Sequence, residues 1–256
     1  MTLLRCHELT VRFGGLVALD RLDLELAAGE ILGLIGPNGS GKTTFFNAIT
    51  GIYRSAAGRA TFGEHELTAM SPQRIYGVGI TRTFQRSRLA LPLSVFDNIM
   101  IGNHRLLHHG LAFNLFRRRA LRAELEAHVD KARALVATFS KPLAARLFEP
   151  VATFSMIDRR RIEICRALVS EPRLLLLDEP SAGMTHEETR ELMDDILAAR
   201  ERLPGLAIVI IEHEMNVIER VSQRCAVLNY GRKIAEGTYA EVAAAREVQV
   251  AYLGTE

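Results

Sequence analysis

The sequence predicts an α/β fold with a parallel-sheet core, an N-terminal antiparallel β subdomain and an inserted helical subdomain. Short apolar runs alternate with helical segments in both terminal parts of the chain, a pattern typical of parallel strands joined by crossover helices. From about residue 84 to residue 170 strand signals become scarce and helical segments dominate. A chain of 256 residues is long enough for one large α/β domain with an appended subdomain.

The first part of the chain contains four expected strands and two expected helices. Two strands come first, over 3–13 and 17–26, the second with alternating apolar and charged residues. An apolar run over 31–35 predicts a buried strand, and the helix that begins at Lys42 ends before Gly51. A strand over 58–62 follows. Ser71 and Pro72 have the N-cap and first-turn chemistry that opens a short helix.

The second part begins with the helical insertion and returns to α/β alternation. The insertion has helical segments over 116–139 and 158–169. The elements expected after it are a strand over 173–177, a helix over 186–202, a strand over 207–211, a helix from Glu214, strands over 224–229 and 233–236, and a helical tail. We therefore expect residues 1–84 and 171–256 to form the core and residues 85–170 the inserted subdomain.

Composition excludes several classes of protein. The formal net charge of +2 is too small to indicate a nucleic-acid-binding protein. Three scattered cysteines, Cys6, Cys165 and Cys225, give neither a disulfide framework nor metal-ligand spacing, which favours a reducing cytosol. We see no signal peptide and no run of about 18 apolar residues, so we do not expect the chain to span a membrane by itself.

A glycine-rich loop connects the strand over 31–35 to the helix from Lys42. It fits the pattern G-x-x-x-x-G-K-[ST] through Gly36, Pro37, Asn38, Gly39, Ser40, Gly41, Lys42 and Thr43, and Thr44 follows. Glycines allow the backbone to wrap a phosphate with amide N–H groups pointing inward, and the helix N-terminus adds its positive end. Lys42 can reach the outer phosphates, and the Thr43 hydroxyl can ligate Mg²⁺. The alternative is a plain glycine turn before a helix.

A pair of carboxylates ends the apolar strand over 173–177. Asp178 and Glu179 would lie at the carboxyl edge of a parallel sheet, where ligands bind in such folds. Asp178 suits a role at Mg²⁺, and Glu179 suits a general base that orients the attacking water. A buried strand followed by a solvated acidic turn is the simpler alternative.

The phosphate loop and the acidic pair occur in all P-loop NTPases, so they do not distinguish kinases, GTPases and transport ATPases. Four further features lie in a characteristic order along the chain: Gln85, Ser155 before an arginine-rich helix, the Pro-Ser-Ala-Gly segment over 180–183, and His213 after the strand over 207–211. In that order they resemble the ABC ATPase family over essentially the whole chain.

The resemblance implies an ATP-hydrolysing protein with ATP and Mg²⁺ as ligands. It implies that Gln85 senses the γ-phosphate and Mg²⁺, and that His213 contacts the γ-phosphate and helps to hold Glu179 and the water. Phe13 would stack on adenine, as a flat aromatic ring can. The alternatives are that Gln85 is an ordinary surface residue and that Phe13 belongs to the core.

Four segments resemble one branch of the family, the larger ATPase subunit of branched-chain amino acid importers. These segments cover residues 12–16, 81–85, 211–215 and 251–254, and the long insertion over 103–142 is also like that type. Urea and short-amide importers have closely similar subunits, and lipopolysaccharide-export ATPases share the Tyr-Leu-Gly ending. The solute is therefore an expectation from resemblance.

The resemblance also implies partners and a location. Two ATPase subunits pair head to tail as a heterodimer or homodimer, integral-membrane permease subunits bind them, and a periplasmic or extracellular solute-binding protein acts with the permease. The chain would dock through its helical insertion and the region after Gln85. It would lie at the cytoplasmic face of the inner or plasma membrane as a peripheral protein, and no nucleic-acid partner is expected.

The segment that corresponds to the family's signature, Leu-Ser-Gly-Gly-Gln, departs from it. Here it is Phe154, Ser155, Met156, Ile157 and Asp158. In the family this loop completes the partner's nucleotide site, so Ser155 is a candidate nucleotide contact and can also cap a helix. We expect a β-branched Ile157 to crowd the approach to the γ-phosphate and to disfavour positive φ, and Asp158 to add unfavourable negative charge.

The altered signature leads to the hypothesis of an asymmetric dimer, in which this chain's phosphate loop pairs with an intact signature of another chain. Residues Thr185 and His186, after the acidic pair, also depart from the family's pattern. Two alternatives stay open: a nucleotide-binding but weakly hydrolysing regulatory subunit, and a soluble ABC ATPase of DNA repair or translation.

Other patterns have ordinary explanations that we prefer. The arginine runs over 117–119 and 159–161 suggest membrane or nucleic-acid contact but are expected to be solvated helix faces. His108 and His109 could bind a metal but are expected in a surface loop. Cys165 is expected to be a small core residue and not a nucleophile.

Overall fold

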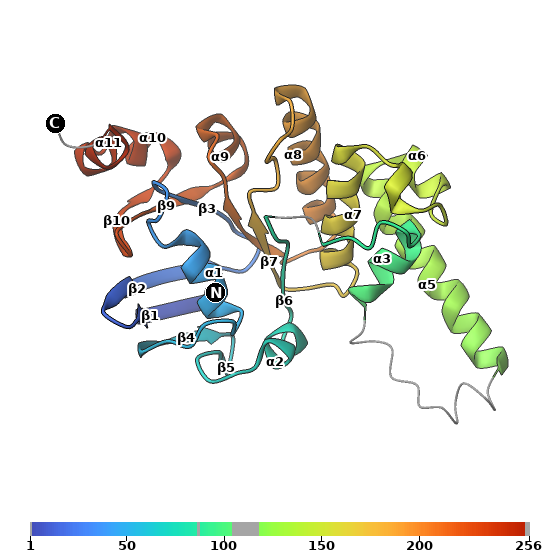
Figure 1. The fold of residues 1–256 in the computed structure, drawn as a ribbon, viewed down its shortest axis with the longest axis horizontal. Coiled ribbons are helices and arrows are strands. Elements are labelled where there is room, and N and C mark those ends of the chain that lie inside the picture. Colours follow the sequence, from blue (N-terminus) through green and yellow to red (C-terminus); the bar gives the residue numbers. More distant parts are fainter. Residues whose placement is uncertain (1, 86–87, 104–117, 254–256) are drawn as a thin grey trace. The chain divides into compact units, whose positions relative to one another are not determined.

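A computed structural model describes residues 2–85, 88–103 and 118–253 of the chain (Figure 1). It divides into two compact units. The first consists of Met1–Arg82, Arg173–Pro180 and Pro204–Glu256, and the second of Thr83–Pro172 and Ser181–Leu203. Each unit is described by itself below.

The first unit contains an antiparallel sheet with the strand order β2-β1-β4-β5. Its strands are β1 (Thr2–Phe13), β2 (Leu16–Ala27), β4 (Ala57–Phe62) and β5 (His65–Glu66). Along β2, buried and exposed residues alternate through Leu22, Leu24 and Leu26, because successive side chains point to opposite faces of a sheet. This confirms the predicted antiparallel β subdomain.

A second sheet of the same unit has the strand order β10-β9-β3-β8-β7-β6. Its strands are β3 (Ile31–Ile35), β6 (Ile80–Arg82), β7 (Leu174–Asp178), β8 (Ala207–Ile211), β9 (Arg224–Asn229) and β10 (Arg232–Gly237). All pairs are parallel except the one between β9 and β10. Strands β3, β7 and β8 are buried over their whole length, as expected for parallel strands covered on both faces.

Helix α1 (Lys42–Ile49) packs in the core that the two sheets share (Figure 1). Its Phe45, Phe46 and Ile49 belong to the same buried cluster as residues from both sheets. Because α1 follows the loop after β3 directly, this packing fixes the position of the loop at the carboxyl edge of the parallel sheet.

Helix α9 (Met215–Val221) covers the opposite face of the parallel sheet at β3. A Cβ atom on Gly33 would lie 2.8 Å from Cγ2 of Ile218, so glycine permits the close approach of strand and helix. The remaining helices of the unit are α2 (Pro72–Gly77), α10 (Tyr239–Ala244) and α11 (Arg246–Leu253).

The described part of the second unit consists of helices. They are α3 (Val95–Ile101), α5 (Arg118–Phe139), α6 (Lys141–Ala145), a 3₁₀ turn (Val151–Thr153), α7 (Met156–Leu168) and α8 (His186–Glu201). Helix α8 packs against α5 and α7. The sequence placed its residues with the core, and the structure groups them with the helical unit instead.

The principal strands and helices agree with the prediction within a few residues at their ends. The sequence missed β5, β6, α3 and α6, each of which has seven residues or fewer. Among the helices that the structure describes, none combines the length and the apolar character needed to cross a bilayer.

Candidate functional site

The phosphate loop has a backbone that depends on glycine. Gly36, Gly39 and Gly41 have φ values of 146°, 77° and 109°. A Cβ atom on Gly36 would lie 2.1 Å from the carbonyl oxygen of Leu228, so no other residue fits there without movement of β9. Helix α1 begins after Gly41 with neither a side-chain cap nor an acidic residue in its first turn. Its N-terminal amides are thus available to an anion.

Lys42 is buried at the start of α1, with 6% of its surface exposed. Its Nζ donates hydrogen bonds to the carbonyl oxygens of Gly36 at 2.6 Å and Pro37 at 3.0 Å. Burial lowers the pKa of the Lys42 ammonium, and the nearby carboxylates of Glu179 and Asp178 oppose that shift. A cation is therefore held inside the loop, where it can bind phosphate oxygens.

Glu179 follows β7 and pairs with His213, which follows β8. The Nε2 of His213 lies 2.8 Å from Oε1 of Glu179. Because a carboxylate only accepts hydrogen bonds, Nε2 carries the proton in this arrangement. The backbone N–H of Glu179 donates to the carbonyl of Ile211 at 2.9 Å, which holds the residue at a φ of 49°. The pair has the geometry to hold a water and accept its proton.

Asp178 is the last residue of β7 and is buried. Its Oδ2 accepts a hydrogen bond from Nη2 of Arg82 at 2.5 Å, and Nη1 of Arg82 donates to Oδ1 of Asn47 at 2.6 Å. No role was predicted for Arg82 or Asn47, because the strand β6 that carries Arg82 was not predicted.

A pocket of about 360 Å³ brings most of the predicted residues of the first unit together. It is lined by Phe13, Leu16, Val17, Ala18, Asn38, Gly39, Ser40, Gly41, Lys42, Thr43, Thr44, Glu179, His213, Tyr230 and Gly231. Phe13 is 45% exposed and packs edge-on against Tyr53, with ring centroids 4.9 Å apart. It is therefore not a core residue, and its exposed ring suits stacking on a base. Leu16 and Tyr230 were not predicted, because they become neighbours of the loop only in the fold.

The C-terminal helix α11 reaches the phosphate loop. A smaller pocket of about 190 Å³ is lined by loop residues from Pro37 to Ser40 together with Val250 and Ala251. Burial raises the pKa of Tyr252 to about 12, against the effect of a hydrogen bond with the backbone of Gly36. The segment over 251–254 marked the branch of the family, and its Tyr252 contacts the nucleotide loop directly. Gly254 lies outside the described residues.

The residues present fit a nucleotide with Mg²⁺. The glycine cradle leaves open space at Gly39, where a Cβ atom would meet nothing within 4 Å. Thr43 is exposed on the pocket wall, and the Asp178 carboxylate is close enough to act on Lys42. Among the described residues there is no group of three or more His, Cys, Asp or Glu side chains for a metal.

The signature segment lies in the second unit at the start of α7. Ser155 caps this helix, as predicted: its Oγ accepts from the N–H of Asp158 at 3.3 Å and donates to Oδ2 of Asp158 at 3.1 Å. The other carboxylate oxygen of Asp158 accepts from Nη1 of Arg161 at 3.1 Å. Gln85, also of the second unit, is exposed. Its predicted action at the γ-phosphate and Mg²⁺ stays a prediction.

One expectation about this helix, a solvated face of arginines, was wrong. Ile157 is 8% exposed and has ordinary helical backbone. Its predicted crowding of the approach to the γ-phosphate stays a prediction. The residue beside it, Met156, is the one that is 50% exposed. Arg160 and Arg161 do not form a solvated face: both are buried, and their ion pairs include Glu163 at 2.8 Å and Glu191 at 2.5 Å.

Cys165 is fully buried and burial raises its thiol pKa, which confirms a core role. The prediction of a surface loop at His108 and His109, the start of the helix at Phe116 and the arginine at position 117 fall outside the described residues.

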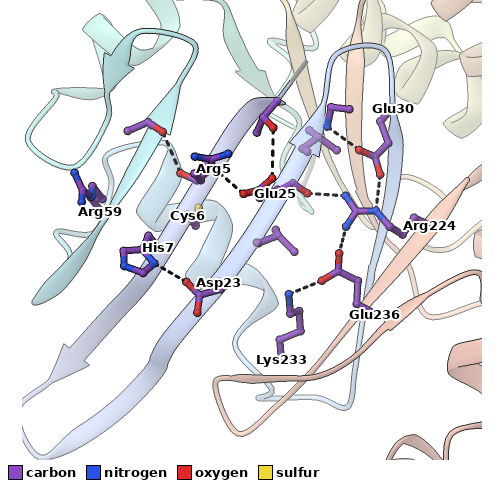
Figure 2. Close-up of a pocket in the computed structure, with 15 residues that line it drawn as sticks. Arg5, Cys6, His7, Asp23, Glu25, Glu30, Arg59, Arg224, Lys233 and Glu236 are labelled. Atoms are coloured by element: carbon purple, nitrogen blue, oxygen red, sulfur yellow. Dashed lines mark hydrogen bonds and ion pairs between the residues drawn. The ribbon is translucent and has the colours of Figure 1, made fainter.

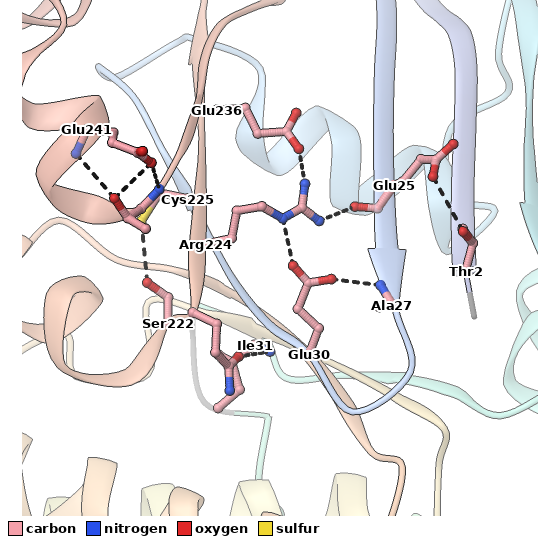
Figure 3. A network of polar contacts seen from close by, with 12 residues as sticks. Thr2, Glu25, Ala27, Glu30, Ile31, Ser222, Arg224, Cys225, Glu236 and Glu241 are labelled. Carbon is pink, nitrogen blue, oxygen red and sulfur yellow. Dashed lines mark hydrogen bonds and ion pairs between the residues drawn. The ribbon is translucent and has the colours of Figure 1, made fainter.

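A larger pocket, of about 920 Å³, lies elsewhere in the first unit (Figure 2). Charged side chains line it, and most of them pair with one another. Arg5 contacts Glu25 at 2.8 Å, and His7 contacts Asp23 at 3.0 Å. Figure 3 shows Arg224 at the centre of a network with Glu25, Glu30 and Glu236. These contacts link the two sheets, and none of the predicted site residues lines this pocket, so we assign it a structural role.

Comparisons with known proteins agree with the geometry. The sequence profile of the family described as ABC transporter matches residues 19–182. The high-affinity branched-chain amino acid transport ATP-binding protein LivG of Salmonella typhimurium is 37% identical over 252 residues, 98% of each chain. BraF of Pseudomonas aeruginosa, with the same description, is 34% identical over 253 residues, again 98% of each. The solved ADP conformation of MJ1267, an ATP-binding cassette of an ABC transporter, is 28% identical, with a TM-score of 0.85 and 100% coverage of both chains.

Proposed function

This chain belongs to the ABC transporter family, and on that premise we propose that it is the ATP-hydrolysing subunit of a membrane importer for branched-chain or other amino acids. The proposal of an importer and its solute is supported by the likeness to LivG and BraF, ATP-binding proteins of high-affinity branched-chain amino acid transport, which match this chain over nearly its whole length. The proposal of hydrolysis rests on one observation, the 2.8 Å contact between Glu179 and His213 beside the phosphate loop.

The proposed reaction uses the residues of the pocket in separate roles. Amides of the loop and of the first turn of α1 bind the phosphate chain, and Lys42 exchanges its carbonyl contacts for phosphate oxygens. Phe13 stacks on the base. Glu179 orients the water and accepts its proton, while the Nε2–H of His213 holds the carboxylate in place.

The proposed site for Mg²⁺ consists of the Thr43 hydroxyl and the Asp178 carboxylate, with Gln85 as a further contact from the second unit. When bound, the ion neutralises charge on the phosphate oxygens. The residues of this chain hold the ligand atoms in place: Arg82 fixes one oxygen of Asp178, and α1 fixes Thr43.

The proposed partners are a second ATPase subunit, integral-membrane permease subunits and, through them, a solute-binding protein outside the cytoplasm. No nucleic acid is included. The chain would act at the cytoplasmic face of the inner or plasma membrane. Exposed apolar side chains of the second unit, Leu91, Leu93, Ile101 and Phe148, suit contact with a permease.

The experiment is ATP-driven uptake by proteoliposomes that contain this chain with the permease encoded beside it. We expect leucine uptake that stops in a Glu179→Gln variant while the variant still binds ATP. Uptake of urea in place of leucine would show that the solute is urea and not an amino acid. Hydrolysis without any copurifying permease would favour a soluble ABC ATPase.

We propose, as a second candidate, that the altered signature makes this chain the weak half of an asymmetric dimer or a weakly hydrolysing regulatory subunit. The observation that favours it is Asp158, whose carboxylate occupies the N-terminus of α7 through Ser155 and Arg161. Turnover by the isolated chain should then be slow and should rise when a partner with an intact signature is added. Fast turnover by the isolated chain would remove this candidate.

A further inference from the structure

Arg82 forms a buried ion pair at the carboxyl edge of the parallel sheet of the first unit. Its side chain and that of Asp178 are 6% and 4% exposed, and Nη2 lies 2.5 Å from Oδ2. The pair joins the ends of neighbouring parallel strands, because β6 pairs with β7 in a register that places Arg82 opposite Leu176.

Helix α1 supplies two further contacts to the guanidinium. Nη1 donates to Oδ1 of Asn47 at 2.6 Å, and the guanidinium carbon lies 5.2 Å from the ring centroid of Phe46. The helix that follows the phosphate loop thus orients the arginine that binds the acidic residue of the site. A guanidinium held by two partners and a ring loses little further freedom when it pairs.

Stability alone is a weak explanation of this pair. Burying two charges costs desolvation free energy that their attraction only about offsets, and an apolar pair of similar volume often does as well. The position of the pair is informative: Asp178 lies beside Lys42 and immediately before Glu179, in the proposed nucleotide site.

We propose that Arg82 is a positioning residue that acts as the internal counter-ion of Asp178 and weakens the hold of the site on Mg²⁺. The guanidinium occupies one carboxylate oxygen and offsets its charge. A divalent cation that approaches the same carboxylate is repelled by the fixed positive charge a few ångströms away. Mg²⁺ is thus bound firmly only together with nucleotide phosphates, whose negative charge makes up for the part of the Asp178 charge that Arg82 offsets.

The inference rests on the proposed nucleotide site and predicts how Mg²⁺ binding responds to the charge at residue 82. The measurement is the melting temperature of the full chain with saturating ADP, as MgCl₂ is titrated. In Arg82→Met the MgCl₂ concentration for half of the stabilisation should fall about tenfold, because the repulsion is gone. Arg82→Lys keeps the charge and should stay near the wild-type midpoint.

Arg173→Met is the matched control. Arg173 also stacks on a phenylalanine, with its guanidinium carbon 5.1 Å from the ring centroid of Phe62, but it precedes β7 and so lies at the opposite end of the strand from Asp178. Its loss should leave the MgCl₂ midpoint unchanged. If Arg82→Met does not fold, Arg82→Gln serves, since an amide can still donate to Asp178 without the charge.

The outcomes are separable. An equal or higher MgCl₂ midpoint in the neutral variants overturns the role of Arg82, even if they melt at a lower temperature. Failure of the wild-type chain to bind ADP, with or without MgCl₂, overturns the proposed nucleotide site itself. A lower midpoint in Arg82→Met and Arg82→Gln, but not in Arg82→Lys or Arg173→Met, supports the inference.

Discussion

Helices α1 and α7 each begin at a loop that the sequence predicted to bind nucleotide, yet their N-termini differ. Helix α1 of the first unit begins at Gly41, without a side-chain cap or an acidic residue in its first turn. Helix α7 of the second unit begins with Ser155 as the cap and Asp158 in its first turn. Both ends carry the positive end of a helix dipole. The N-terminus of α1 leaves this positive end open to an external anion. The N-terminus of α7 pairs it with the carboxylate of its own Asp158.

The difference shows how a signature segment can keep its serine while the serine hydroxyl is used within its own helix. Ser155 is used locally, because its hydroxyl bonds both the N–H and the carboxylate of Asp158. Arg161 then ties Asp158 to α8 through Glu191 and Asp195. The negative charge of Asp158, which we expected to repel phosphate, is therefore partly neutralised inside the second unit. We infer a weaker anion site at α7 than at α1.

The largest expected effect tests the loop before α1. Gly36→Ala places a Cβ atom 2.1 Å from the backbone oxygen of Leu228, at a φ of 146°. We expect the free energy of unfolding to fall by about 3 kcal/mol, as measured by urea denaturation. Gly77→Ala is the control, because nothing lies within 4 Å of its Cβ position. Equal stability of the two variants would show that the loop is not rigid.

The next effect concerns the cation at α1. Lys42→Met removes charge-assisted hydrogen bonds to phosphate, so the affinity for ATP should fall about a hundredfold in a fluorescent-nucleotide assay. Lys233→Met, in the same unit, removes another partly buried ammonium, paired with Glu236, and should bind ATP normally. If Lys42→Met bound ATP like the wild type, the contrast between the two helix ends would lose its main support.

A smaller effect tests the internal anion of α7. Asp158→Gln restores the family's residue and should strengthen ATP-dependent self-association by up to about tenfold, since like-charge repulsion is removed. Sedimentation of the Glu179→Gln chain with ATP measures it. The matched control is Asp97→Gln: Asp97 occupies the same third position of α3, capped by Ser94. Unchanged association in Asp158→Gln would mean that the altered signature is not limited by charge.

The smallest effect is local. Ser155→Ala removes the cap of α7 and should lower the free energy of unfolding by about 1 kcal/mol, with Ser94→Ala giving a similar loss at α3. The ATPase rate should fall in Ser155→Ala and not in Ser94→Ala, because only Ser155 belongs to the signature. Identical ATPase rates of the paired complex with either variant would leave Ser155 a cap and nothing more.

The first unit was predictable where its chemistry lies in consecutive residues. The phosphate loop and the pair Asp178 and Glu179 each follow an apolar strand, so local pattern and spacing locate them. Arg82 could not be found in this way. Its strand has three residues and gains its structure from pairing with β7, and its contacts lie 35 and 96 residues away in the sequence.

The second unit shows what residue type alone cannot decide. Residue type predicted a solvated face for the arginines over 159–161, but the direction of a side chain depends on the phase of its helix. In α7 that phase turns Ile157 and two arginines inward and leaves Met156 exposed. The grouping of α8 with the helical unit likewise depends on packing against α5 and α7, which no local pattern encodes.

The backbone conformation and the side-chain contact of Glu179 favour different amino acids. Its φ of 49° suits glycine or asparagine, whereas its contact with His213 requires a carboxylate. A non-glycine residue in this region stores about 1 kcal/mol of strain. Glu179→Gly should therefore melt at a higher temperature than the wild type while losing hydrolysis. A screen that selects for thermal stability alone would drive this position away from catalysis, a trade-off set by a single backbone angle.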